Sequence, residues 1–401
     1  MALLGLLAMG CGSSGVAQPQ ASPSASGVSS TASPSASATP KVTPSPAATI
    51  LYAVLEAPRL NAQNTTVAIA GLNGIARAKT HFSPRSTPYA PDVAVVLAPE
   101  AHVVAGVVYF IDGHGVVRTL ERSGRVRQAA VFPMTQKQQE ISFAVSPDGK
   151  HLVAAILTLP SVGKLIPGTG WYELVGPWKL EVDRVDVGGA TVVLHRWQAS
   201  GEPSQPGSFA NIVMAGWDTK GPVAVVGGAF ATQNGQFDQQ TFFGGRFAHV
   251  NIATGLPGSA YACQGDSQAW SVAPDGTTVC ATSISAEAGL TASVSVQSPG
   301  QPVWQPALPA NPPFAFPGSF ALSADGGRLA MDGAVVGRSA STVALNTFFK
   351  PQGWLDAGTM IGVQLSVADP NKSDGMAYVS LSNPTHPVLL GFAGEFVGTI
   401  S

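Results

Sequence analysis

The chain has 401 residues, of which 45% are hydrophobic and 11% are charged, and its formal net charge is −2. This length is enough for one large domain or two smaller ones, and the 45 glycines and 32 prolines favour short strands and turns over long helices. No stretch is basic enough to displace the counterions of a nucleic acid, and no apolar run approaches the roughly 20 residues of a membrane-spanning helix. We therefore expect neither function.

The chain begins with an apolar segment that ends in a cysteine. Residues 1–11 read MALLGLLAMGC, with small Gly10 directly before Cys11. This resembles the end of a bacterial lipoprotein signal peptide, which implies that Cys11 is lipidated and becomes the mature N-terminus. The basic region that opens a secretory signal is missing, so either the true start lies upstream or the apolar region is shortened. An ordinary apolar N-terminus with an incidental cysteine is the alternative.

A stretch rich in serine, proline and alanine follows, over residues 12–48. It carries a single charge, Lys41, and no side chains bulky enough to build a core. Such a composition cannot offset the entropy lost on ordering, so we expect a disordered, extended linker. The linker would hold the domain predicted over residues 49–401 away from the membrane.

Three segments share one template, in which an aromatic residue lies five positions before the aspartate of an Asp-Gly pair. They read FAVSPDGKHLVAA, WSVAPDGTTVCAT and FALSADGGRLAMD, at 143–155, 270–282 and 320–332. The aspartate can bond local amides and the glycine accepts a positive φ, so each segment predicts a β-hairpin with alternating apolar residues on both sides. The predicted turn residues are Asp148, Gly149, Asp275, Gly276, Asp325 and Gly326.

A looser template, with a turn glycine four residues after an aromatic residue, occurs at 109–120, 217–228 and 354–363. The largest gap between successive turn glycines is 72 residues, from Gly149 to Gly221. This gap holds either an unmarked repeat or an insertion.

The repeated hairpins resemble those of TolB-type and WD-repeat-like β-propellers. The resemblance implies an all-β fold with a single propeller, most simply of seven four-stranded blades, with six or eight left open. Segment 50–56 is expected to pair with a strand near the C-terminus and so close the ring. Two β-sandwiches are the alternative, but they would not explain three hairpins in one register. We expect the aromatic residues to pack between blades.

Cys263 and Cys280 are the other two cysteines and lie 17 residues apart. Lipidation of Cys11 leaves an even number, and an exported protein meets an oxidising compartment, so we expect these two to form a disulfide. Two buried free thiols are the alternative.

No combination of motifs in the sequence specifies a reaction. There is no Gly-x-Ser-x-Gly elbow, no HExxH and no phosphate-binding loop, and DPNKSDG at 369–375 lacks the glycine and glutamate of a calcium loop. We therefore predict no catalytic residue, cofactor or metal site, and expect His102 and His114 in loops or at strand ends. Five residues are retained as candidates for a site in the central channel: Asp112, His114, Asp218, Asp266 and Asp356.

These features predict an exported, lipid-anchored propeller at the outer face of the cell envelope that acts as a binding or scaffold module. Its expected ligand is a protein, peptide or glycan, its expected contact with the membrane is the lipid anchor alone, and we expect a monomer. The alternative is a secreted propeller enzyme, a hydrolase or lyase, with its site in the central channel, because propellers host unrelated functions.

Overall fold

The computed structural model describes most of the chain from residue 50 onward. The described residues are 50–56, 65–83, 100–134, 139–165, 167–168, 172–199, 211–226, 246–261, 263, 268–273, 275–281, 293–307, 320–339, 341–369, 372–391 and 393–400. The predicted signal segment with Cys11, the linker over 12–48 and the candidate Asp266 lie outside them. Among these residues, no helix has the length and apolar character needed to span a membrane.

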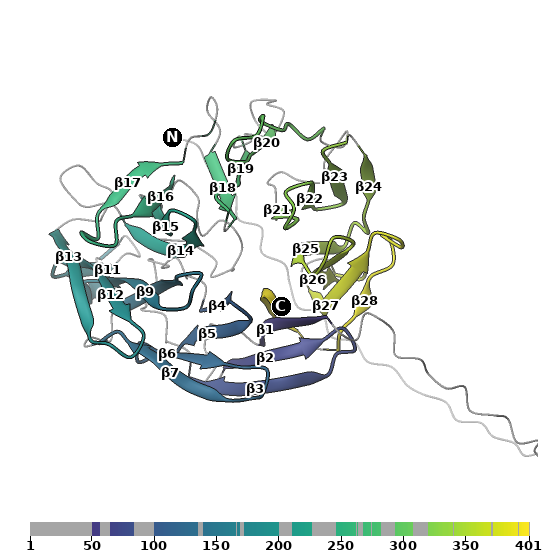
Figure 1. Cartoon of the computed structure of the whole chain (residues 1–401). Coiled ribbons are helices and arrows are strands. Elements are labelled where there is room, and N and C mark those ends of the chain that lie inside the picture. Colours follow the sequence, from purple (N-terminus) through teal and green to yellow (C-terminus); the bar gives the residue numbers. More distant parts are fainter. Residues whose placement is uncertain are drawn as a thin grey trace, which may run out of the picture. The chain divides into compact units, whose positions relative to one another are not determined.

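Most of the described strands form seven antiparallel sheets of three or four strands, and β10 and β11 form a separate two-stranded sheet. Figure 1 shows the strands in the order of the chain. The first sheet has the order β29 (Glu395–Ile400), β1 (Leu51–Glu56), β2 (Thr65–Gly71), β3 (Ala76–Phe82). The second contains β4 (Ala101–Val104), β5 (Val107–Ile111), β6 (Val116–Leu120) and β7 (Val126–Val131). The third has the order β8 (Gln139–Val145), β9 (His151–Thr158), β12 (Trp178–Asp186), β13 (Thr191–Ala199).

The remaining four sheets follow in chain order. The fourth contains β14 (Ile212–Asp218), β15 (Gly221–Val226), β16 (Arg246–Val250) and β17 (Pro257–Ala260). The fifth contains β18 (Gln268–Val272), β19 (Thr278–Ala281) and β20 (Val294–Gln297). The sixth contains β21 (Phe320–Leu322), β22 (Arg328–Met331), β23 (Ala334–Gly337) and β24 (Thr342–Ala344). The seventh contains β25 (Phe349–Trp354), β26 (Thr359–Leu365), β27 (Ser373–Ser380) and β28 (Val388–Leu389).

Both faces of the sheets are apolar, and each face packs against a different neighbour. In β1, Tyr52 and Val54 pack against the seventh sheet, whereas Ala53 and Leu55 pack against the second. The same alternation places a separate apolar cluster between every pair of successive sheets, including the pair formed by the seventh and the first. Seven sheets with seven shared cores make a closed ring. The domain is a seven-bladed β-propeller.

The two ends of the domain meet in the first sheet. Strand β29, near the C-terminus, pairs antiparallel with β1, and Leu51 lies opposite Ile400. The predicted pairing of segment 50–56 with a C-terminal strand is therefore confirmed. It joins the last part of the chain to the first within one sheet, and β29 covers the edge that β1 would otherwise expose.

The third sheet explains the long gap between Gly149 and Gly221. An additional hairpin, β10 (Ser161–Leu165) with β11 (Tyr172–Val175), is inserted between β9 and β12, which pair directly with each other. The gap therefore contains an insertion and no extra blade. In the fifth sheet, three strands are described, and Trp304 pairs with Val296 of β20 in a single bridge where a fourth strand would run.

The three Asp-Gly turns share one geometry. In the first, the amide of Gly149 donates to the carbonyl of Ser146 at 2.8 Å, and the Ser146 hydroxyl donates to Oδ1 of Asp148 at 2.6 Å. Gly149 has a φ of +70°, which a residue with a Cβ rarely adopts. Gly276 and Gly326 also have positive φ and make the same backbone bond. These turns join the first and second strands of their blades, whereas the turn at 112–116 joins the second and third.

The aromatic residues of two of these segments lie in the cores between blades. Phe143 packs between the second and third sheets, and Phe320 packs between the fifth and sixth. Cys263 and Cys280 are joined by a disulfide, with 5.9 Å between their Cα atoms. This bond ties the connection between the fourth and fifth blades to the central strand of the fifth.

Candidate functional site

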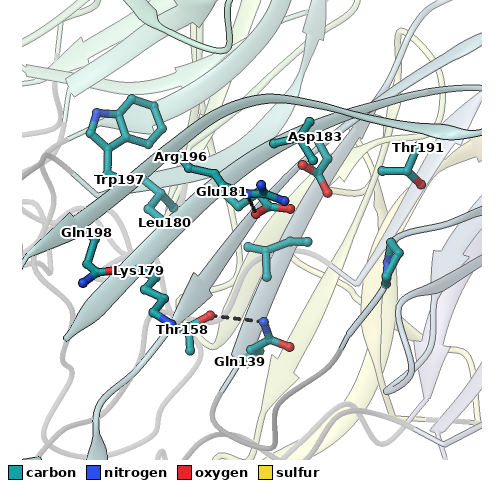
Figure 2. A pocket seen from close by; sticks show the side chains of 13 residues that line it. Gln139, Thr158, Lys179, Leu180, Glu181, Asp183, Thr191, Arg196, Trp197 and Gln198 are labelled. Carbon is teal, nitrogen blue, oxygen red and sulfur yellow. Dashed lines mark hydrogen bonds and ion pairs between the residues drawn. The ribbon is translucent and has the colours of Figure 1, made fainter. Parts of the chain in front are cut away.

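A polar cleft of about 590 Å³ lies along one face of the third sheet. Figure 2 shows its labelled polar side chains, which come from strands β8, β9, β12 and β13. Pro133, which follows the last strand of the second blade, also lines it. The volume is within the range of about 300 to 1,000 Å³ that is typical of small-molecule sites.

The pairing of the strands places these side chains in rows across the sheet. Gln139, Thr158 and Lys179 lie opposite one another on β8, β9 and β12. The next row on the same face contains Glu181 of β12 and Arg196 of β13. Because side chains alternate between faces along a strand, every second residue of β12 points toward the cleft.

Gln139 and Thr158 fix each other at one end of the cleft. The side-chain amide of Gln139 donates to the Thr158 hydroxyl at 3.1 Å, as the dashed line in Figure 2 shows. Both side chains are buried, with 7% and 6% exposed. A hydrogen bond between two buried groups keeps their positions defined, so this end of the cleft is rigid.

Glu181 and Asp183 are two residues apart on β12 and face the same side. Arg196 on the neighbouring strand makes an ion pair with Glu181, and its Nε donates to Oε2 of that residue (Figure 2). The side chain of Glu181 is 28% exposed and that of Arg196 is 68% exposed. Asp183, in contrast, is 1% exposed.

Burial raises the pKa of Asp183 to about 7, and repulsion by Glu181 and a hydrogen bond with it act in the same direction. Arg196 opposes the rise but does not reverse it. The charge of Glu181 so close by makes ionisation of Asp183 harder, so Asp183 keeps its proton at moderately acidic pH. Oδ1 of Asp183 is buried and has no hydrogen-bond donor among the described residues.

The described candidates for a central-channel site do not converge. Asp112, Asp218 and Asp356 lie in the second, fourth and seventh blades, and each accepts hydrogen bonds from amides of its own hairpin turn. His114 supplies one of the amides bound by Asp112. The geometry is that of turn-capping aspartates, and no shared site results.

Asp218 has additional partners. His249 Nε2 lies 2.9 Å from both of its carboxylate oxygens, and the Tyr261 hydroxyl donates to Oδ2. Burial raises the pKa of Tyr261, and its bond to Asp218 raises it further. Burial would raise the pKa of Asp218 as well, but the hydrogen bonds from Tyr261 and His249 outweigh burial and lower it. The cluster therefore holds an ionised aspartate at a turn.

His102 has a structural position on β4. Its Nε2 donates to the carbonyl of Phe143 at 2.8 Å, and its ring meets the Phe143 ring edge to face. Burial lowers the pKa of His102 to about 4. The neutral imidazole thus links the first strands of the second and third blades.

Metal-binding potential is low in the described part of the chain, where no three His, Cys, Asp or Glu side chains gather closely enough to hold an ion. Within segment 369–375, Asp369 pairs with Lys372 at 3.3 Å. Asn371 of that segment lies outside the described residues.

Sequence reasoning did not identify Glu181, Asp183 or Arg196. These residues lie in the gap between Gly149 and Gly221, where neither hairpin template occurs. The segment KLEVDRVD, over 179–186, does contain a signal for a polar site. Glu181 and Asp183 alternate there with apolar residues, although both faces of an inner propeller strand are expected to be buried. The partner Arg196 could not be found without the register between β12 and β13.

The chain is similar to several solved structures at low sequence identity. No protein-family model matches the chain, and no curated protein matches its sequence. Among solved structures, the Dos1 propeller covers 86% of this chain over 86% of its own length, at 9% identity and a TM-score of 0.41. An oligogalacturonate lyase from Vibrio parahaemolyticus covers 87% of this chain with 96% of its own length, at 8% identity and a TM-score of 0.41. A protein described as putative TolB from Agrobacterium tumefaciens covers 86% of this chain with 91% of its own length, at 10% identity and a TM-score of 0.29. The predicted β-propeller is confirmed by the sheets of this chain and the apolar cores that they share.

Proposed function

We propose that this protein is an exported, lipid-anchored binding module of the cell envelope, and that the cleft of the third blade is its ligand site. The lipid anchor rests on the sequence, where Cys11 ends an apolar segment and a polar linker follows. The ligand site rests on the geometry of the cleft. A ligand there would be small and polar, in keeping with the volume and the lining residues.

Asp183 carries the proposal. A buried carboxyl oxygen without a hydrogen-bond donor costs free energy, on the order of 1–3 kcal/mol. Oδ1 of Asp183 is in this condition, and the residue lines the cleft. A ligand that brings a donor removes the cost, which makes this side chain a natural point of attachment.

One observation favours an enzyme as the second candidate. A carboxyl whose pKa lies near 7 can act as a general acid or base close to neutral pH. Paired carboxylates of glycoside hydrolases, however, are about 5 to 9.5 Å apart. Glu181 and Asp183 are two residues apart on one face of β12, and the described residues around them do not assign the two roles of acid and base. Binding is therefore the function that the geometry supports best.

Two experiments test the proposal. In the native host, the full chain should partition with membranes, and Cys11→Ala should release it; a chain that stays membrane-bound after this change contradicts the lipid anchor. For the ligand site, a library of small amines, sugars and short peptides is screened by thermal shift with the purified full chain. Hits should lose their effect in Asp183→Asn and keep it in Asp374→Asn, which makes the same chemical change at an exposed position. If the hits shift the melting temperature of both variants as they do that of the natural protein, the ligand site lies outside the cleft.

A further inference from the structure

We propose that the cleft is selective for ligands that carry a protonated amine, and that the ammonium group binds at Asp183 beside Glu181. This inference rests on the proposed function and specifies the chemical class of its ligand. It follows from the distribution of charge in the cleft, from the hydrogen-bonding capacity of the carboxyl pair and from the apolar wall beside it.

The charges in the cleft are unevenly matched. Glu181 has a cation of its own, because Arg196 pairs with it directly. Asp183 has no ion pair among the described residues, and the nearest cation on its own face of β12 besides Arg196 is Lys179, four residues away. At about 3.3 Å per residue, four residues place Lys179 about 13 Å along the strand. Asp183 is thus the carboxyl that has no ion pair among the described residues.

The carboxyl pair also lacks hydrogen-bond donors. The two groups present four oxygen atoms, of which Oε2 of Glu181 receives Arg196 and one position is taken by the bond between the carboxyls. Oδ1 of Asp183 receives none from the described residues. A proton supplies one donor, whereas an ammonium group supplies three and a full positive charge. An ammonium group satisfies the pair more completely than the proton does.

Among the described residues, the positions directly opposite Asp183 in the sheet carry no cation. Opposite it in the sheet are Ala154 on β9 and Val193 on β13. In the second blade, Arg127 of β7 pairs with Glu121 at 3.2 Å. These neighbours leave an apolar surface next to the carboxyl pair, which suits the hydrocarbon part of an amine.

The remaining titratable groups of the third sheet lie away from the pair. His151 pairs with Asp186 at 2.7 Å, beyond the buried Val185. Glu140 of β8 lies opposite Leu157, on the other face of the sheet. The titration that accompanies binding is therefore that of Asp183.

A bare metal ion fits less well. Calcium takes six to eight oxygen ligands, and magnesium requires a near-octahedral set. The described part of the cleft offers two carboxylates, and Arg196 already occupies one of them. An organic cation needs fewer ligands and benefits from the apolar wall.

Binding of an ammonium group in place of a proton makes affinity depend on pH. Below the pKa of Asp183, each rise of one pH unit should lower Kd on the order of tenfold, and the dependence should level off above about pH 7. An alkylammonium ion keeps its own proton throughout this range, because amines of the lysine type have a pKa of about 10.4.

The test uses the full chain with butylammonium chloride as the probe, butan-1-ol as the neutral control and calcium chloride as the metal control. Isothermal titration at pH 5.5, 6.5 and 7.5, in two buffers of different ionisation enthalpy, measures affinity and proton release together. We expect butylammonium to bind with Kd falling at least tenfold over this range, with release of up to one proton at pH 6.5. We expect neither control to bind at this site.

Asp183→Asn should abolish binding and proton release, and Asp374→Asn should leave both unchanged. If Asp183→Asn does not fold, Glu181→Gln, at a half-buried position, carries the same test. Affinity that is independent of pH, equal binding of butan-1-ol, tighter binding of calcium or no binding of butylammonium overturns the inference. If a library ligand without an amine still binds and still needs Asp183, the proposed function stands while this inference fails. If no ligand depends on Asp183, both fail.

Discussion

Replacing Asp183 with asparagine should change how the stability of the propeller depends on pH. Burial and Glu181 raise the pKa of this carboxyl from its ordinary 3.8 to about 7. Between these values the folded protein keeps a proton that the unfolded chain has released. The resulting stabilisation is present in full below about pH 3.8, decreases as the pH rises, and is gone above about pH 7.

The size of the effect follows from the two pKa values. Each pH unit between them corresponds to 1.36 kcal/mol, so the rise from 3.8 to about 7 amounts to about 4 kcal/mol. Asparagine does not titrate, so the free energy of unfolding of Asp183→Asn, relative to the natural protein, should increase by up to about 4 kcal/mol between pH 4 and pH 8.

The measurement is urea unfolding of both proteins, followed by tryptophan fluorescence at intervals of half a pH unit. Subtracting one curve from the other cancels the groups that the two proteins share. Asp374→Asn, at an exposed position, should give a difference that does not vary with pH. A flat difference for Asp183→Asn, or one that decreases as the pH rises, would refute the electrostatic argument for the cleft.

Three further predictions concern the fold. Gly149→Ala should lower the free energy of unfolding by about 1–2 kcal/mol, because φ is +70° and an added Cβ would lie 2.6 Å from the Tyr109 hydroxyl; Gly216→Ala, where an added Cβ meets nothing within 4 Å, should change the urea midpoint little. Replacing Cys263 and Cys280 together with serine should lower stability by about 3 kcal/mol, as judged from urea unfolding, and a reductant should then have no further effect. Removal of residues 395–401 leaves the edge of β1 unpaired, so its amides should lose protection in hydrogen exchange before those of β5; unchanged protection of β1 would contradict its role in closing the ring.

The repeated hairpins could be predicted because their chemistry is local. A turn that needs an aspartate acceptor and a glycine with positive φ can be recognised from four consecutive residues of the sequence, as at 146–149. The closure by β1 and β29 followed from the general need to remove sheet edges and required no knowledge of side chains. The size of the repeats then indicated seven blades.

The cleft could not be predicted because it depends on register. Glu181 and Arg196 are 15 residues apart, and nothing in the sequence between them fixes which residues of β12 and β13 lie opposite each other. A bulge between Val182 and Asp183 shifts that register by one residue partway along. Asp112 and Asp218 are conspicuous in the sequence because each lies next to a turn that contains glycine. Their role in the structure is to cap these turns.

The lengths of the strands explain why the cleft forms in the third blade. β12 and β13 have nine residues each, whereas the strands of the second blade have four to six. At about 3.3 Å per residue, the third sheet extends about 10 Å or more beyond the surface that its neighbour can cover. Along one face of β12, Val185 lies in the shared core and is 1% exposed, whereas Lys179 is exposed.

Asp183 lies at the boundary between these two regions. It is as buried as Val185, yet it lines the cleft as Lys179 does. An apolar residue at this position would spare the domain the cost of burying a carboxyl next to Glu181. At the same boundary, burial strengthens any interaction with a ligand, because the local dielectric constant is low, while the uncovered end of the sheet gives the ligand access. The part of the third sheet that extends beyond the second blade thus explains why Asp183 is buried at a cost in free energy. It also explains why a ligand can reach Asp183 and offset that cost by binding.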